Sequence, residues 1–186
     1  GSYLLLEIDN GPVEIQKLQN TTTVIRNFLK GKKINFNDLR IENKKIIFNV
    51  DKNNAELVET FFLDKESEIN PYYNQYKSHQ FDLEIQEGKF ILELSKYGLI
   101  EIKTSSQDQA LEIVRRRVDE VGTNEPNIIK RGNNRILVEL PGLDDPMRIK
   151  SLLGKTANLT FRFVTQNTND TFGTEMLQFE DGTNEA

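Results

Sequence analysis

The chain has 186 residues, enough for one or two small globular domains, and its 37% of hydrophobic and 28% of charged residues support packed cores. It contains no cysteine and one histidine, which excludes disulfides, thiolate metal sites and most histidine-based catalytic triads. No apolar run is long enough to span a bilayer, and none has the character of a signal-peptide core.

The net charge of −5 arises at one end of the chain. The acidic residues of segment 165–186 are Asp170, Glu175, Glu180, Asp181 and Glu185. This segment has no lysine or arginine, so the remainder of the chain is charge-balanced. A balanced body lacks the basic field that attracts nucleic acid, and we expect no nucleic-acid partner.

The N-terminal part predicts a strand followed by a helix. Residues 3–8 are leucine-rich and lead into the turn signal Asp9-Asn10-Gly11, after which Pro12 suits a first helical position. The helix ends at Gly31 and carries one apolar stripe. The residues of this stripe are Ile15, Leu18, Thr22, Ile25, Phe28 and Leu29.

Further strands and a second helix are predicted before residue 95. Two strands are expected at roughly 34–41 and 45–50, and Asn53 or Asn54 is expected to cap a helix. The apolar side of this helix is Leu57, Val58, Phe61 and Phe62. Residues 65–79 are polar and predict a loop. Alternating apolar residues on both sides of Glu87-Gly88 then predict a hairpin over residues 81–94.

Residues 96–121 fit two descriptions. The β-branched residues within 99–103 suit a strand, whereas apolar steps of three and four along the whole segment favour one long helix. We prefer the helix, with a weak point near 104–106 and an end at Gly122. The stepping residues are Tyr97, Ile100, Thr104, Gln107, Leu111, Val114, Val118 and Val121.

The C-terminal part predicts a second hairpin, a short helix and a last strand. The hairpin is expected over 127–140, around Gly132-Asn133-Asn134. Asp144 or Asp145 is expected to cap the helix, which ends at Gly154, and residues 159–163 alternate as a strand.

This order of elements predicts an α+β fold made of two tandem ferredoxin-like (βαββαβ) units with antiparallel sheets. The first unit is expected over residues 1–86 and the second over residues 87–164. A flexible acidic tail is expected over residues 165–186.

One stretch is more specific than composition. It begins with Arg115-Arg116-Arg117-Val118-Asp119-Glu120-Val121-Gly122 and continues through Asn134-Arg135-Ile136-Leu137-Val138-Glu139-Leu140-Pro141-Gly142 to Leu159-Thr160-Phe161-Arg162. The stretch resembles the first extracytoplasmic domain of SecD, a subunit of the bacterial protein-export machinery. Residues 3–9 resemble the segment that follows the first membrane helix of that family. The motif residues are Arg117, Gly122, Glu125, Pro126, Gly132, Arg135, Leu140, Pro141, Gly142, Asp145, Thr156, Ala157 and Phe161.

The resemblance implies a function in protein export. SecD resembles a proton-driven transporter that acts with SecF and the Sec channel on translocating preproteins. The family resides in the bacterial inner membrane, and this chain resembles its periplasmic base domain, with membrane contact only through helices absent from the chain. The head that contacts the preprotein in that family would begin near residue 186. The proton-carrying membrane residues of that family are absent from this chain, so the resemblance implies no catalytic residue, no metal and no cofactor.

The motif residues also have structural explanations. Gly122 suits a helix end in the left-handed conformation. Asp145 suits a helix cap better than a metal site formed together with Asp144. Arg115, Arg116 and Arg117 lie 100° apart and cannot form one flat patch; one is expected to pair with a carboxylate such as Asp119 or Glu120.

Other candidate sites are Arg135 and the aromatic loop. Arg135 is expected to bridge to Glu125 or Glu139. The tyrosines 72, 73 and 76, beside His79, suit either recognition or packing.

Three functions remain open from the residues. The first is a non-enzymatic, mechanical module of the export apparatus. The second is a ferredoxin-like module that binds a small regulatory molecule, although no phosphate loop or ligand cluster supports it. The third is an acylphosphatase-type hydrolase, for which no loop supplies both an anion cradle and a positioned polar group.

Overall fold

The computed structural model describes residues 3–120, 122, 125–142, 145–154, 159–164, 177–178 and 184–185. The chain divides into two compact units. Unit 1 consists of Gly1–Asn10 and Lys103–Ala186, and unit 2 is Gly11–Ile102. Each unit has its own hydrophobic core and its own four-stranded antiparallel sheet, which confirms the predicted α+β class.

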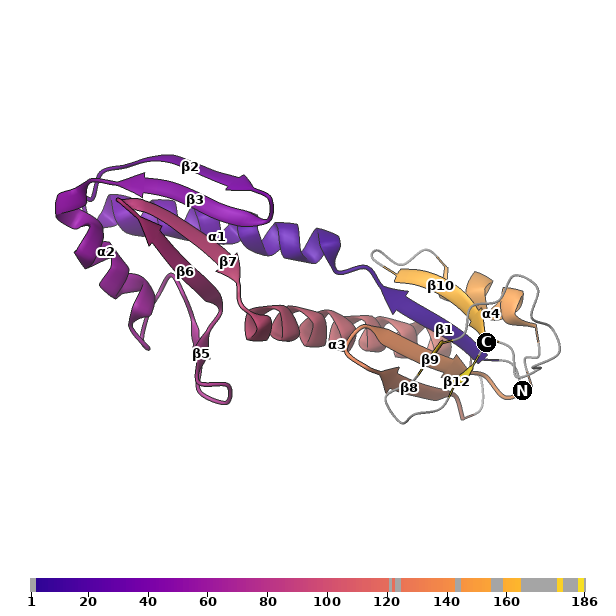
Figure 1. Cartoon of the computed structure of the whole chain (residues 1–186). Coiled ribbons are helices and arrows are strands. Elements are labelled where there is room, and N and C mark those ends of the chain that lie inside the picture. Colours follow the sequence, from indigo (N-terminus) through magenta and orange to yellow (C-terminus); the bar gives the residue numbers. More distant parts are fainter. Residues whose placement is uncertain are drawn as a thin grey trace. The chain divides into compact units, whose positions relative to one another are not determined.

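The main sheet of unit 1 has the strand order β10-β1-β9-β8 (Figure 1). Its elements are β1 (Tyr3–Ile8), the later part of α3 (Lys96–Glu120), β8 (Asn127–Arg131), β9 (Arg135–Glu139), α4 (Pro146–Leu153) and β10 (Leu159–Val164). Two further short strands, β11 (Leu177–Gln178) and β12 (Asn184–Glu185), pair with each other. The main elements thus follow the order β-α-β-β-α-β.

Strand β1 lies in the interior of this sheet because its sequence can be buried on both faces. Leu4, Leu5 and Leu6 are each 0% exposed. Leu4 and Leu6 join the core that contains the apolar residues of α3 and α4, whereas Leu5 packs with Leu137 in a separate small cluster. A continuous leucine run is typical of such a two-sided strand.

The predicted boundaries of the two units, 1–86 and 87–164, are wrong. Strand β1 pairs with β9 and β10, which lie in the C-terminal half of the chain. In the sheet of unit 2, the strand Lys89–Leu94 pairs with β3 (Lys45–Val50) instead. The units are therefore nested instead of tandem. The order of elements alone was misleading, since a strand at the start of one βαββαβ run can serve a sheet much further along the chain.

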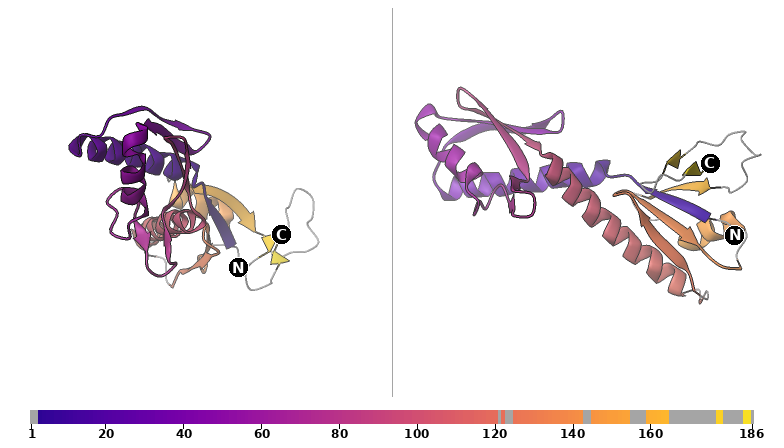
Figure 2. Two further views of the ribbon diagram at one scale, coloured as in Figure 1. Left: turned by 60° about the vertical axis from the view of Figure 1, so that its left-hand side comes forward. Right: turned by 60° about the horizontal axis from the view of Figure 1, so that its bottom comes forward.

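Unit 2 contains a sheet with the order β2-β3-β7-β6. Its elements are α1 (Gly11–Gly31), β2 (Phe36–Glu42), β3 (Lys45–Val50), α2 (Lys52–Leu63), β4 (Tyr72–Tyr73), β5 (Ser78–His79), β6 (Phe81–Gln86), β7 (Lys89–Leu94) and the beginning of α3. Figure 2 shows α1 and α2 on one face of this sheet. Compared with the sheet of unit 1, the strand in the place of β1 comes last in unit 2, as β7.

Aromatic stacking organises the core of unit 2. The rings of Phe48 on β3 and Phe90 on β7 are stacked with centroids 5.1 Å apart, and Phe62 of α2 lies 6.0 Å from Phe48. Helix α1 contributes most of the predicted stripe, with Ile25 and Leu29 fully buried, whereas the predicted stripe residue Ile15 is 48% exposed. Such ring pairs add stability beyond the apolar area that they bury.

The predicted helices and hairpins are present, and helix α3 is continuous across Lys96–Glu120, as preferred over a strand. Two details differ from the prediction. The predicted cap of α2 at Asn53 or Asn54 is wrong, because Asp51 occupies the N-cap position and makes no side-chain cap hydrogen bond. The polar segment predicted as a loop contains the two-residue strands β4 and β5.

Separate cores predict separate responses to core mutations. Phe48→Ala should lower the free energy of unfolding of unit 2 by about 3–5 kcal/mol, because it leaves a cavity between Phe62 and Phe90. Amide hydrogen exchange should then show faster exchange in β3 and β7 with unchanged protection in β1 and β9. The matched variant Val138→Ala should show the reverse pattern. Equal loss of protection in both units would contradict the division of the chain.

Candidate functional site

The motif residues of unit 1 gather where helix α3 meets the β8–β9 hairpin and helix α4. Gln107 of α3 is 3% exposed, and its Nε2 donates hydrogen bonds to the carbonyls of Gly132 at 3.0 Å and Arg135 at 2.9 Å. A third, longer contact of 3.5 Å reaches the carbonyl of Arg131. Gln107 therefore fixes the hairpin turn, in which Gly132 has a φ of +56°.

Sequence reasoning missed the importance of Gln107, although a signal was present. Gln107 lies on the stripe of α3 that steps by three and four, between Thr104 and Leu111. A polar side chain on an otherwise apolar face is expected to be buried with hydrogen-bond partners. The partners could not be identified in advance because they are backbone carbonyls far along the chain.

Arg117 holds the C-terminal end of helix α4. Its Nη1 donates to the carbonyl of Leu153, which is one of the last carbonyls of that helix. The next residue, Gly154, has a φ of +61°, and a Cβ built on it would lie 2.8 Å from the same Nη1. The guanidinium of Arg117 thus caps the C-terminal end of α4. The positive φ of the residue that follows this end is one that glycine adopts easily and other residues do not.

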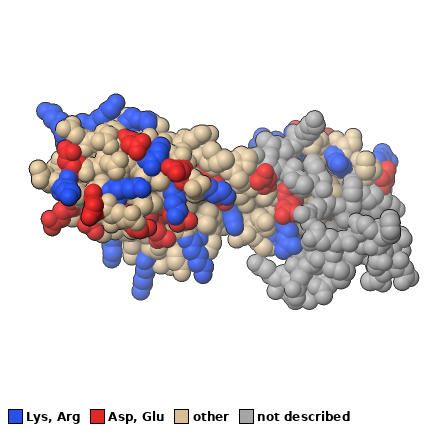
Figure 3. All heavy atoms as spheres, turned by 45° about the horizontal axis from the view of Figure 1, so that its top comes forward, with Lys and Arg blue, Asp and Glu red and all other residues tan. Residues whose placement is uncertain are grey.

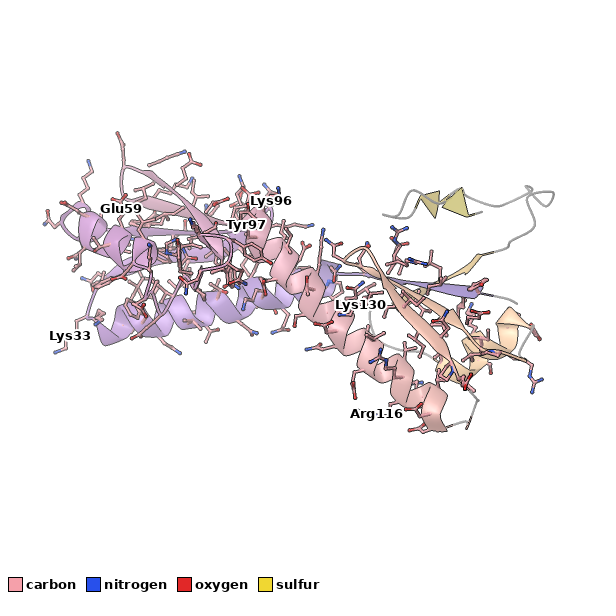
Figure 4. The ribbon with its side chains drawn as sticks, turned by 90° about the horizontal axis from the view of Figure 1, so that it is seen from below. Lys33, Glu59, Lys96, Tyr97, Arg116 and Lys130 are labelled. Atoms are coloured by element: carbon pink, nitrogen blue, oxygen red, sulfur yellow. The ribbon has the colours of Figure 1, made fainter. Side chains whose placement is uncertain are left out.

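The neighbouring arginines have other surroundings. The expected carboxylate pair is made by Arg116, whose Nη2 lies 3.9 Å from Glu112 one helical turn away, and not through Asp119 or Glu120. Figure 4 shows Arg116 near the end of α3. Both side chains of this pair are largely exposed, so it adds little stability.

Asp145 caps helix α4 as predicted. Its Oδ1 accepts a hydrogen bond from the backbone N–H of Met147 at 3.0 Å, and Pro146 occupies the first turn. This contact explains the carboxylate without a metal ion. Within the described ranges, no group of three or more histidine, cysteine, aspartate or glutamate residues is arranged to hold a metal ion. Asp144 lies outside the described residues.

Two motif glycines occupy turns that require a positive φ. Gly122 follows α3 with a φ of +67°, and its N–H donates to the carbonyl of Asp119 at 3.1 Å. Gly142 has a φ of +81° and is exposed. Side chains with a Cβ resist this region, so Gly122 ends α3 as predicted, and Gly142 lies in the turn that follows β9.

The remaining motif residues surround the hairpin. Glu125 has a φ of +48° immediately before Pro126, which precedes β8, and Leu140 is 2% exposed in the core. Arg135 begins β9 opposite Glu7 and Arg131, and its carbonyl accepts from Gln107. The expected bridge from Arg135 to Glu125 or Glu139 stays a prediction.

The last motif residues have limited or no structural description. The exposed Pro141 lies between Leu140 and Gly142. Phe161 of β10 pairs in register with Leu6 of β1. Thr156 and Ala157 lie outside the described residues, as does most of the predicted acidic tail.

The aromatic loop of unit 2 forms a second cluster. The rings of Tyr76 and Tyr97 are stacked 4.6 Å apart, and Tyr73 meets Tyr76 edge-on at 6.1 Å. The hydrogen bond between Tyr76 and Glu101 raises the pKa of Tyr76 above its usual value. Figure 4 shows Tyr97 at the start of α3. These contacts favour packing of the loop against α3 over a free recognition surface.

The surface charges are mixed. Figure 3 shows basic and acidic side chains interspersed over the face of unit 2 that it displays. In unit 1, the ammonium of Lys130 on β8 pairs with the carboxylate of Asp108 on α3. The charged and polar groups at the motif mainly hold the backbone in place, which is an architecture suited to stiffness.

Comparisons with known proteins identify relatives over most of the chain. Residues 107–166 match the family model described as "Protein translocase subunit SecDF, P1 domain, N-terminal". The SecD protein of Acetobacter pasteurianus is 34% identical over 169 residues, which cover 90% of this chain and 31% of the relative. The SecD protein of Pseudomonas aeruginosa is 30% identical over 183 residues, which cover 97% of this chain and 28% of the relative. The chain thus spans about a third of the length of these relatives.

Replacing Gln107 should destabilise unit 1. Gln107→Leu keeps the side-chain volume but leaves buried carbonyls of the hairpin without a donor, which should lower the free energy of unfolding by about 1–3 kcal/mol. The exposed neighbour Gln109 offers a matched control, and Gln109→Leu should change stability little. Equal denaturation midpoints for Gln107→Leu and the unchanged chain would contradict the assigned role.

Substitution of Gly154 tests the cap formed with Arg117. Gly154→Ala should lower the free energy of unfolding of unit 1 by about 1–3 kcal/mol, because alanine is strained at this φ and displaces the guanidinium. Gly31→Ala is the control, since a Cβ on Gly31 meets nothing within 4 Å. Thermal unfolding of both variants provides the comparison, and an unperturbed Gly154→Ala would refute the cap.

Proposed function

The chain belongs to the first periplasmic (P1) domain of SecD, and from this membership we propose that it is a mechanical part of a subunit that assists preprotein translocation. The match of residues 107–166 to the P1 model and the SecD relatives along nine-tenths of the chain support the proposal. In this proposal, SecF and the Sec channel are the partners in the full-length protein, and the proton-motive force supplies the energy.

The structure of unit 1 is consistent with a rigid base. Gln107, Arg117 and Asp145 each hold a backbone group of a neighbouring turn or helix end. Hydrogen bonds of this kind oppose local opening of hairpins and helix ends, where proteins otherwise open first. A base that transmits movement needs this resistance, so the motif residues are proposed to serve stiffness and not chemistry.

The proposed location is the periplasmic side of the bacterial inner membrane. No helix within the described residues is both long and apolar enough to cross a bilayer. Attachment to the membrane is proposed to occur through helices of the full-length protein outside this chain. The domain is proposed to have no enzymatic activity. The alternative of a small-molecule-binding regulatory module gains no specific support from the described side chains.

Depletion and replacement of the full-length protein test this function. Cells depleted of their full-length protein should accumulate unprocessed secretory precursors, and expression of the intact protein should restore processing. Arg117→Ala in the full-length protein should restore it only partly, because loss of a charge-assisted hydrogen bond costs about 1.5–3 kcal/mol.

Arg116→Ala is the matched control on the same helix, and it should restore processing fully because the ion pair with Glu112 is exposed. Immunoblots must show equal amounts of each protein. Normal precursor processing in cells without the protein would refute the proposed function.

A further inference from the structure

Strand β6 is an open edge of the unit 2 sheet. It pairs with β7 on one side, without a bulge, from Phe81↔Leu94 to Gln86↔Lys89 (Figure 1). An unpaired edge presents backbone donors and acceptors that accept an additional strand.

The register determines which residues face outward. The N–H of Ser95 donates to the carbonyl of Gln80, so the even-numbered residues of β6 bond to β7. In an antiparallel ladder the residues between them face away from that neighbour. Phe81, Leu83 and Ile85 consequently direct their N–H and C=O groups outward.

The first outward residue is already occupied. The side-chain amide of Asn70 accepts from the N–H of Phe81 at 2.9 Å and donates to its carbonyl at 3.1 Å. Asn70 is 0% exposed and imitates one residue of an added strand. This contact confirms the outward direction of Phe81, and no described hydrogen bond occupies the outward groups of Leu83 and Ile85.

The other edge of the same sheet is protected. Strand β2 has an irregular register between Asn37 and Arg40, and Asp38 has a φ of +58°. Arg40 bonds to the carboxylates of Asp38 and Glu42 and covers this edge with charge. Bulges and charges of this kind prevent strand addition, so β6 is the receptive edge of unit 2.

Charge on β6 restricts the occupant. Asp82 and Glu84 are exposed on the sheet face opposite the helices, whereas the half-buried Leu83 and Ile85 pack against the core. A second copy of β6 in antiparallel pairing would bring carboxylates close to carboxylates, which is unfavourable. A strand with lysine or arginine at alternate positions would instead place a cation beside each carboxylate.

We propose that β6 binds an extended polypeptide segment by strand addition, with basic side chains beside Asp82 and Glu84 and apolar side chains beside Leu83 and Ile85. The site lies outside residues 107–166, which match the family model. Binding of a basic extended segment at β6 follows from the edge and its charges and does not depend on the proposed function. Only the identification of a translocating chain as the natural occupant rests on the proposed function.

A synthetic peptide of alternating lysine and valine tests the proposal with the complete chain. Fluorescence anisotropy should show saturable binding, and hydrogen exchange should show new protection at the amides of Leu83 and Ile85. The same peptide with N-methylated backbone amides should not bind, because it cannot complete the ladder. Equal binding of the methylated peptide, or no new protection at these amides, would overturn the proposal.

Charge reversal provides the second arm. Asp82→Lys combined with Glu84→Lys should weaken binding of the lysine–valine peptide about tenfold, given the interaction energies of cross-strand charge pairs. The same double variant should bind a glutamate–valine peptide more tightly than the unchanged chain does. Glu56→Lys combined with Glu59→Lys makes the same change of charge on helix α2, outside strand β6 itself, and it should leave the dissociation constant unchanged. Equal effects of both double variants would overturn the assigned site. Neither result depends on precursor processing, so failure here is distinguishable from failure of the proposed function.

Discussion

The burial of strand β1 between β9 and β10 is the constraint on which the fold depends. Tyr3–Ile8 supplies an interior strand of the unit 1 sheet, and Leu4, Leu6 and Ile8 supply part of its core. Without this strand, β10 would lose its partner and the β8–β9 hairpin would lose its neighbour. A segment from the beginning of the chain must therefore reach elements that follow residue 120. Unit 2 is consequently an insertion between the first strand of unit 1 and the helix that follows.

Side-chain hydrogen bonds to backbone groups recur throughout both units. Gln107, Arg117 and Asp145 use them in unit 1, and Asn70 makes two with the backbone of Phe81 at the edge of the unit 2 sheet. In each case a single side chain satisfies a group that a helix end, turn or strand edge would leave unpaired. Charged motif residues such as Arg117 and Asp145 are of types that occur in catalytic sites, but here they stabilise the backbone conformation. This role also agrees with a domain whose proposed work is mechanical.

The sequence predicted what depends on local periodicity and little of what depends on distant pairing. The stripe that includes Ile25 and Leu29 predicted α1, and the alternation around Glu87-Gly88 predicted the hairpin of β6 and β7. The assignment of β1 failed because a strand carries no local record of its partner. The roles of Gln107 and Arg117 were missed for the same reason, since their acceptors lie 24 or more residues away. Asp145 was predicted correctly because a helix cap is local.

An engineered disulfide tests the central claim most directly, namely that β1 pairs with β9. The chain has no cysteine, so a Tyr3→Cys, Glu139→Cys pair reports on one contact only. These residues are register partners in a non-hydrogen-bonded position, whose Cα separation suits a disulfide. The account predicts that mild oxidation forms the bond quantitatively in the folded monomer, as read by thiol titration. Persistence of two free thiols in the folded, oxidised protein would contradict it.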